Sequence, residues 1–443
     1  MKGSMMEEES FSRVLLVGLD NGEEQDFERS MEELASLAEA AGKQVVGLIV
    51  QRMTAVNKAL YIGTGKVAEV REYADECGAQ EVVFDNALTP SQVRNLGREL
   101  ELPILDRTNL ILDIFALRAR TREAKLQVET ARLQYILPRL VGMRENLSRQ
   151  GGTGGSMSNR GAGETKLELD RRKIEHRISE LRRELENVAR GRETMRKKRS
   201  SSGVPQVALV GYTNAGKSTV MNRMVRLYGE NSEKTVLEKD MLFATLETQV
   251  RSIHTGDSKP FLLVDTVGFI RKLPHGLVKA FHSTLEEVRY ADLLVQVVDF
   301  SDEQYKEQME VTAETLRELG AGDIPQIILY NKIDKCLSAH QPEIRGNHIY
   351  MAASQGLGME DLIEMIKAAV YAGREETCFL IPYDKGSISS YLMEKSTVLD
   401  QEYREEGVWL HVSCHRNDAE KYSMYRCGSG KTGSAVVQQT SAK

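Results

Sequence analysis

The chain has 443 residues, of which 41% are hydrophobic and 6% aromatic, and its formal net charge is −6. This length exceeds what one hydrophobic core usually organises, so we expect three domains. No apolar run approaches the roughly 20 residues that a membrane-spanning helix needs, and the first ten residues have neither a signal-peptide core nor the Arg-rich composition of a transit peptide. We therefore expect a cytoplasmic protein without a membrane span.

The cysteines give no sign of a disulfide framework or a zinc site, because they are odd in number, lie far apart and form no CxxC pair. They are Cys77, Cys336, Cys378, Cys414 and Cys427. We expect reduced thiols to which the sequence assigns no role.

Residues 12–106 alternate short apolar runs with helix-like stretches. The alternation predicts parallel strands joined by crossover helices, and so an N-terminal α/β domain over residues 1–106. Its segment YIGTGK, residues 61–66, is similar to a phosphate-binding loop, but that motif requires a glycine and a hydroxyl where the chain has Leu60 and Val67. We expect a structural turn before a helix at this point.

Residues 107–199 predict a helical arm. Its first helix is expected to end or kink at Pro138. Apolar residues then recur at the spacing of a helical seam, and we expect two antiparallel helices that share it. The seam residues are Leu167, Ile174, Ile178, Leu181, Leu185 and Val188. A helix from Glu164 to about Arg199 would be roughly 50 Å long, which puts the connection between the helices at the tip of an arm.

The arm is basic in an acidic chain: residues 118–199 hold 22 Lys and Arg against 11 Asp and Glu. Such a segment favours contact with an anionic partner such as nucleic acid, and a solvated charged helix is the alternative. The tip connection, residues 148–166, is rich in glycine, which allows close approach of the backbone to RNA; a flexible linker is the alternative. The candidate RNA contacts are Arg149, Gly151, Gly152, Gly154, Gly155, Arg160 and Lys166.

Further boundaries follow from composition. Residues 200–206 predict a linker, residues 207–372 the central domain, and residues 373–426 a small C-terminal α/β domain of βαβ type. Residues 427–443 are polar and rich in Gly and Ser, and are predicted to be disordered. Their GSGKTG is a second false match to the phosphate loop, because Tyr425 stands where the motif requires glycine.

The segment QVALVGYTNAGKST places an apolar strand directly before a complete G-x-x-x-x-G-K-S motif. In this motif backbone N–H groups and a helix N-terminus hold phosphates, Lys217 reaches the β- and γ-phosphates, and Ser218 offers its hydroxyl to Mg²⁺. The nucleotide contacts predicted from this loop are Gly211, Tyr212, Thr213, Asn214, Ala215, Gly216, Lys217, Ser218 and Thr219.

Two more segments complete a phosphate and metal site. Asp265 ends the strand FLLVD and can hold Mg²⁺ through water, while Gly268 offers a backbone N–H to the γ-phosphate. Thr245 in MLFATLE is expected to bind Mg²⁺ when a triphosphate is present, with Thr235 and Thr248 as weaker candidates. The catalytic candidates are Lys217, Thr245 and Gly268, and the Mg²⁺ ligands are Ser218, Thr245 and, through water, Asp265.

Guanine is the expected base. The segment NKID follows an apolar strand, and its Asp334 can accept two hydrogen bonds from guanine, which adenine cannot donate. A later MAASQG segment keeps Ala353, whose backbone N–H can reach guanine O6, whereas Ala352 lacks the hydroxyl that would brace the loop. The predicted guanine contacts are Asn331, Lys332, Asp334, Ala352, Ala353 and Ser354.

With these motifs the chain resembles the HflX-type GTPases, a translation-factor-related family of P-loop proteins. The segments YIGTGK, DNALTPSQVRNLGRELELPILDRTNLILDIFALRARTREAKLQVETARLQY, GGTGGSMSNRGAGETKLELDRR and LFATLE are similar to that family's own. The resemblance covers residues 12–372 well and the tail loosely. It implies a Mg²⁺-dependent GTPase that docks on the large ribosomal subunit, sends the arm tip toward the peptidyl transferase centre and splits stalled ribosomes. We expect a monomer.

Phe269 stands where many such enzymes place a water-orienting glutamine. A phenyl ring cannot orient water, so we expect slow intrinsic hydrolysis, with the missing group supplied by another part of the chain or by the ribosome. The alternative is that Phe269 is a packed core residue. A different function remains open, a non-ribosomal regulatory GTPase whose arm binds a protein partner through its apolar seam, whereas no motif supports an ATPase activity of the N-terminal domain.

Overall fold

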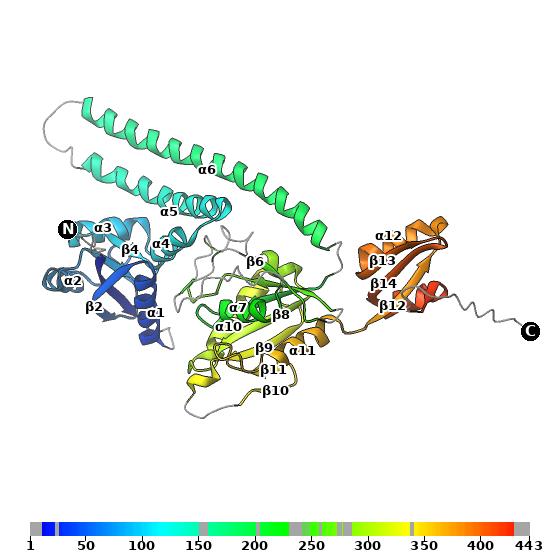
Figure 1. Cartoon of the computed structure of the whole chain (residues 1–443). Helices are drawn as coiled ribbons and strands as arrows, with labels where there is room; N and C mark the ends of the chain where they lie inside the picture. Colours follow the sequence, from blue (N-terminus) through cyan, green and yellow to red (C-terminus); the bar gives the residue numbers. More distant parts are fainter. Residues whose placement is uncertain are drawn as a thin grey trace, which may run out of the picture.

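The structure, a computed structural model, describes residues 11–22, 26–149, 158–200, 204–229, 242–243, 246, 248–256, 259–272, 277, 286–336 and 341–428. For residues 141–149, 158–167, 193, 195–200 and 286 it describes the backbone only. Three β-sheets and a pair of long helices organise this part of the chain (Figure 1), and the predicted α/β class is confirmed. No described helix is both long and apolar enough to cross a bilayer.

The N-terminal sheet and its covering helices consist of β1 (Ser12–Asp20), α1 (Phe27–Ala40), β2 (Lys43–Arg52), α2 (Thr64–Cys77), β3 (Glu81–Phe84), α3 (Pro90–Leu100) and β4 (Ile104–Asp106). The strands are all parallel, in the order β2-β1-β3-β4, as the alternating sequence predicted. β1 is buried on both faces, because Leu16 packs with α1 whereas Leu15 packs with α2 and α3. The expected turn is present: Tyr61 has φ +67° and α2 begins three residues later.

Three helices follow this sheet in the chain, α4 (Arg107–Arg118), α5 (Arg122–Arg149) and α6 (Ser158–Ser200). α5 and α6 lie side by side and antiparallel (Figure 1), since Arg122 pairs with Glu184 at 2.7 Å and Arg177 with Glu129 at 2.8 Å. The backbone of α6 already starts at Ser158, so part of the segment predicted as the tip connection is helix.

The first arm helix was predicted to end or kink at Pro138; it does not end there, because α5 continues through this residue to Arg149. A proline inside a helix removes one backbone hydrogen bond and costs about 3 kcal/mol. Tertiary contacts at the next residue offset that cost: Arg139 donates to Leu88 O and to Asp106 Oδ2, both at 3.0 Å, and lies over the Tyr135 ring. The helix instead breaks earlier, between Arg118 and Arg122.

The central sheet has seven strands in the order β10-β11-β9-β8-β5-β7-β6, of which β6 and β10 are antiparallel to their neighbours. The strands are β5 (Gln206–Val210), β6 (Gln249–Ile253), β7 (Phe261–Asp265), β8 (Leu293–Asp299), β9 (Gln326–Asn331), β10 (Glu343–Arg345) and β11 (His348–Tyr350). Its described helices are α7 (Lys217–Tyr228), η1 (Glu286–Tyr290), α10 (Tyr305–Glu318), η2 (Ile333–Lys335) and α11 (Met359–Val370). The carboxyl ends of β5, β7, β8 and β9 lie at one edge, where the nucleotide motifs follow them.

The C-terminal unit consists of β12 (Arg374–Ile381), η3 (Tyr383–Lys385), α12 (Gly386–Lys395), β13 (Thr397–Arg404), β14 (Gly407–His415), α13 (Arg416–Lys421), η4 (Ser423–Tyr425) and β15 (Arg426–Cys427). The predicted βαβ unit is wrong, because all strand pairs in the order β13-β14-β12-β15 are antiparallel. Two residues join β13 to β14, which allows only a hairpin. Cys427, predicted to be disordered, lies in β15, and residues 429–443 are outside the described part.

A buried ion cluster joins the N-terminal sheet to the central one. Arg107, which is 2% exposed, pairs with Glu33 of α1 and, at 2.7 Å, with Asp85 after β3. Lys272, which follows β7, reaches the same cluster: its Nζ lies 2.5 Å from Asp85 Oδ2 and 2.9 Å from Ser30 Oγ. We call these five residues the Arg107 cluster. It ties the ends of α1, β3 and α4 to the segment that follows β7.

Replacing Arg107 should destabilise the N-terminal sheet strongly. Arg107→Ala leaves the buried Asp85 with Lys272 as its remaining cation and removes the cation paired with the partly buried Glu33, and breaking a buried ion pair costs about 3 to 5 kcal/mol. Hydrogen exchange of the β1 and β3 amides measures the local free energy of opening. The matched control is Arg132→Ala, because the exposed Arg132 pairs with a partly buried Asp113 and such a surface pair is worth about 1 kcal/mol or less. Equal protection losses in the two variants would contradict the role of the cluster.

Candidate functional site

The loop between β5 and α7 can be built only with glycine at its two ends. Gly211 has φ +141°, and a Cβ there would lie 2.2 Å from Val297 O. Gly216 has φ +98°, and its Cβ would lie 2.2 Å from Asn331 Nδ2. The loop therefore passes closely over β8 and β9, and Lys217, Ser218 and Thr219 form the first turn of α7. Backbone N–H groups at such a helix start favour a bound anion.

Lys217 is 7% exposed and folds back onto the loop. Its Nζ donates to Gly211 O at 3.0 Å and to Tyr212 O at 2.7 Å. Burial lowers the pKa of Lys217 to about 8, and the nearby Asp265 carboxylate opposes that shift. A phosphate beside the ammonium would favour its charged form. Near pH 8, Lys217 therefore takes up a proton when a phosphate binds.

Ser218 and Asp265 lie together below the loop. The Ser218 hydroxyl donates to Asp265 Oδ2 at 3.1 Å, and Asp265 is fully buried at the end of β7. A hydroxyl and a carboxylate are hard oxygen donors of the kind that Mg²⁺ prefers, so these residues fit the ion. Thr245 and Thr235 lie outside the described residues, and Thr248 immediately precedes β6, whose first residue pairs with Asp265.

The segment after β7 is attached to the phosphate loop through its backbone. Phe269 donates its N–H to Gly211 O at 3.1 Å and accepts from Thr213 N–H at 2.8 Å. Its ring is 1% exposed and belongs to a cluster with Phe243. The Phe269 ring is therefore packed in the core, as the alternative interpretation expected, and slow intrinsic hydrolysis stays a prediction. A Cβ on Gly268 would lie 2.8 Å from Thr213 Cα, so glycine is required beside the loop.

Asn331 and Lys332 connect the phosphate loop to the other guanine segments. Asn331 Nδ2 donates to Ala215 O at 2.9 Å, and its Oδ1 accepts from Ala353 N–H at 3.0 Å. Lys332, with φ +64°, donates to Asn214 O at 2.8 Å and pairs with Asp299 at 2.7 Å. The Ala353 N–H that was predicted to reach guanine O6 is thus engaged by Asn331.

The loop after β11 is braced without a hydroxyl at residue 352. Ala352 and Leu357 exchange two backbone hydrogen bonds, at 3.2 and 3.1 Å. Arg223 of α7 donates to Ser354 O at 3.1 Å, and the Ser354 hydroxyl lies 3.4 Å from Asp334 Oδ2. Asp334 is exposed at this edge, so its carboxylate is accessible to a base.

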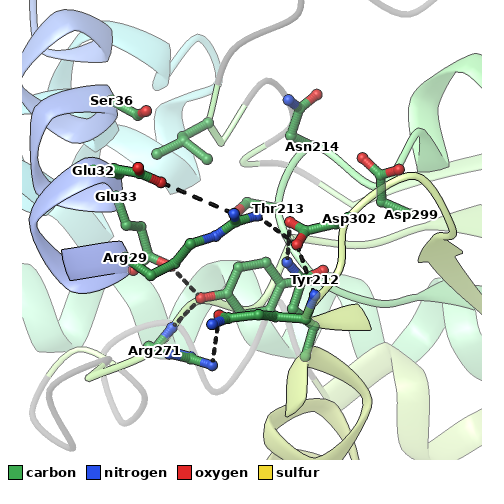
Figure 2. A pocket seen from close by; sticks show the side chains of 13 residues that line it. Arg29, Glu32, Glu33, Ser36, Tyr212, Thr213, Asn214, Arg271, Asp299 and Asp302 are labelled. Carbon is green, nitrogen blue, oxygen red and sulfur yellow. Dashed lines mark hydrogen bonds and ion pairs between the residues drawn. The ribbon is translucent and has the colours of Figure 1, made fainter. Parts of the chain in front are cut away.

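A cavity of about 240 Å³ lies between α1 and the phosphate loop (Figure 2). Tyr212 projects from the loop, donates its hydroxyl proton to Glu33 and accepts the Arg271 backbone N–H at 2.9 Å. Arg29 of α1 pairs with Asp302 across the cavity. Burial raises the pKa of Tyr212, which keeps its hydroxyl a neutral donor. The phosphate loop is thereby connected to the N-terminal sheet.

The sequence did not predict these contacts between α1 and the phosphate loop. Arg29 and Glu33 are about 180 residues away from the loop that they approach, and nothing in a helix-like stretch signals such a contact. Asp299 could have been found, because it ends an apolar strand as Asp265 does. Of the predicted RNA contacts, the four glycines lie outside the described residues, and Arg149, Arg160 and Lys166 are described only as helix backbone.

Nucleotide affinity should fall as the pH rises above the pKa of Lys217. That pKa, about 8 without ligand, is below the ordinary 10.5, and bound phosphates raise it. Binding then requires a proton above pH 8, and GDP affinity should drop about tenfold between pH 7 and pH 9. Titration calorimetry at each pH measures it. Lys217→Met is the control, because it retains any effect of guanine-ring titration. An equal change of GDP affinity with pH in the two proteins would contradict the assignment to Lys217.

Comparison with known proteins places this geometry in a family. Three family profiles match consecutive parts of the chain: a GTP-binding GTPase N-terminal region over residues 28–116, a GTP-binding GTPase middle region over 118–199, and a 50S ribosome-binding GTPase over 206–332. A GTP-binding protein of Sulfolobus solfataricus, solved in complex with GDP, is 25% identical with a TM-score of 0.42, covering 81% of this chain and 98% of that one.

Relatives of full length are more similar. The GTPase HflX of Caldanaerobacter subterraneus subsp. tengcongensis is 42% identical over 93% of this chain and 94% of its own. The GTPase HflX of Escherichia coli K12 is 39% identical over 89% of this chain and 91% of its own. The chain therefore belongs to the HflX family of GTPases, and it binds guanine nucleotides and hydrolyses GTP.

Proposed function

We propose that this GTPase acts as a cytoplasmic monomer that binds the large ribosomal subunit with GTP and splits stalled ribosomes. The observation that carries the proposal is the basic arm. α6 has 43 residues and would be about 65 Å long if straight, and the arm segment 118–199 has twice as many Lys and Arg as Asp and Glu. A long basic helical pair suits contact with folded RNA, whose phosphates dominate its surface charge.

The roles of the nucleotide site follow from its contacts. We assign Lys217 and the amides of residues 211–219 to the phosphates, and Gly268 N–H to the γ-phosphate. Ser218, Thr245 and, through water, Asp265 would hold Mg²⁺, which supplies charge neutralisation during phosphoryl transfer. Asp334 would select guanine, with Asn331 and Lys332 bracing the loops around the base. Ala352, Ala353 and Ser354 would line the guanine edge.

Slow intrinsic hydrolysis fits the buried Phe269. Its side chain is 1% exposed, so it has no access to a water that attacks the γ-phosphate. The group that orients this water must come from another side chain or from the ribosome. Hydrolysis would then accelerate on docking and end the bound state.

The alternative, a regulator whose arm binds a protein through its apolar seam, is disfavoured by packing. The seam residues Ile178 and Leu181 are 5% and 0% exposed in the described arm. An interface on this seam would have to separate α5 from α6 first. Cosedimentation still discriminates: no association with large subunits in any nucleotide state would favour the regulator.

Asp334→Asn should change the preferred base. An amide cannot accept both hydrogen bonds from guanine, whereas its N–H₂ can donate to the extra carbonyl of xanthine. Affinity for GDP should fall about 100-fold while affinity for xanthosine diphosphate rises. Competition with a fluorescent GDP analogue measures both. Asp323→Asn, at an exposed carboxylate, is the control. Retained preference for guanine would show that specificity lies elsewhere.

Altering the arm tip should separate GTP hydrolysis from ribosome splitting. Bulkier residues at Gly151, Gly152, Gly154 and Gly155, with Arg149→Ala and Arg160→Ala, would block close approach and remove two phosphate contacts. Intrinsic GTPase rates should stay within about twofold of the parent's, which tests that the nucleotide site is intact. Light scattering of intact ribosomes should show loss of splitting, and the salt dependence of binding should weaken.

The control for this variant removes equal charge elsewhere on the arm. Arg171→Ala with Arg172→Ala changes two exposed arginines of α6 that pair with glutamates of their own helix. Splitting should persist in this protein. Wild-type splitting by the tip variant would reduce the arm to a spacer.

A further inference from the structure

Two of the five cysteines lie directly opposite each other in the C-terminal sheet. Cys378 of β12 is the register partner of Cys427 in β15, and the two strands are antiparallel. Directly opposite residues in such a pair have Cα atoms about 4.5 or 5.5 Å apart, and their side chains point to the same face. Both spacings lie within the range that disulfides span. The backbone thus holds the two sulfurs at a distance that a bond could close.

The two thiols differ in access. Cys378 is 5% exposed, whereas Cys427 is partly exposed at the edge of the sheet. The apolar core of this unit, which includes Phe379 and Leu410, lies on the other face with α12 and α13. Cys427 is therefore the more accessible of the two thiols to a small molecule in solution.

Trp409 lies beside Cys427. Its side chain is 2% exposed, and its indole N–H interacts with the Cys427 thiol. Burial raises the pKa of the Cys427 thiol, and the Trp409 indole N–H and the Arg404 charge act against that rise. Arg404 lies over the Trp409 ring at 4.6 Å. Because burial is the largest effect, the pKa of the Cys427 thiol stays above its ordinary value, and burial raises the pKa of the Cys378 thiol too.

We propose that Cys378 and Cys427 are a thiol pair that forms a reversible disulfide by exchange with a low-molecular-weight disulfide such as oxidised glutathione. The Cys427 thiolate attacks one glutathione sulfur, which breaks the glutathione S–S bond and releases one glutathione thiolate. The Cys378 thiolate then attacks Cys427 Sγ and releases the second. Two protein thiols are oxidised and one glutathione disulfide is reduced to two thiols.

The bond would attach the end of the described chain to the sheet. β15 pairs with β12 through two residues, and Arg426 of β15 also donates to Ala419 O and pairs with Glu375. A covalent link from Cys427 to Cys378 restricts the unfolded ensemble of everything between them and holds the last described residues in place. Under oxidising conditions β15 would be linked covalently to β12, and under reducing conditions it would be held by non-covalent contacts alone. This inference is independent of the proposed ribosomal function.

The test uses the full-length protein in glutathione buffers of defined ratio. After equilibration, free thiols are alkylated at low pH and the peptides are mapped by mass spectrometry without reduction. We expect one internal disulfide, between Cys378 and Cys427, that dithiothreitol reverses. Trp409 is the only tryptophan in the sequence, so its fluorescence reports this position alone and should be quenched in step with disulfide formation. The ratio at half quenching measures the stability of the bond.

Two variants make the result decisive. Cys427→Ser, at a partly exposed position, should fold and lose both the disulfide and the quenching, whereas Cys77→Ser in the N-terminal sheet should retain both. A stable glutathione adduct at Cys427 with Cys378 still alkylated would overturn the proposal, because the second exchange step would be absent. The proposal would also be overturned if Cys378 and Cys427 both stayed free thiols at every ratio of reduced to oxidised glutathione at which Trp409 fluorescence shows a folded sheet.

Discussion

The Arg107 cluster, with its buried guanidinium and Lys272, is the interaction on which the relation between the N-terminal and central sheets depends. Arg107 and Asp85 are 2% and 0% exposed, and removing such ions from water costs several kcal/mol each unless they stay paired. Because separating Arg107 from Asp85 is costly, the ion pair holds α1 and the ends of β3 and α4 together. Lys272 adds a second cation from the segment after β7. The same α1 supplies Glu33 to Tyr212 of the phosphate loop, so this loop is attached to the N-terminal sheet.

The nucleotide site is held by contacts among its own loops. Asn331 connects Ala215 to Ala353, and Lys332 connects Asn214 to Asp299, so four segments that follow different strands support one another before any ligand binds. The glycines of the phosphate loop are required by this close approach, since a Cβ on either would meet β8 or β9. Preorganisation of this kind reduces the ordering cost of nucleotide binding.

The arm and the C-terminal unit show where local signals lose to tertiary contacts. Pro138 is a strong local helix breaker, yet the contacts of Arg139 with Leu88 and Asp106 hold the chain helical through it. In the tail, an apolar run, a helix and a second apolar run indicated a βαβ unit. The polar strand β13 between them was not apparent in the sequence. Its two-residue connection to β14 forms an antiparallel hairpin, and β12 pairs antiparallel with β14. The Cys378–Cys427 pairing depends on that sheet.

The sequence by itself determined the family, the parallel N-terminal sheet and the order of the nucleotide motifs, because each is written in contiguous residues whose spacing reflects local geometry: strand, glycine turn and helix start. It predicted Lys217, Ser218, Asp265 and Asp334 as nucleotide-site residues for the same reason. Only the tertiary structure decided that the Phe269 ring is packed in the core, that Ala353 N–H bonds to Asn331, and that α1 reaches the phosphate loop. These features join residues far apart in the chain, and burial and hydrogen-bond partners at such distances depend on packing that no local pattern encodes.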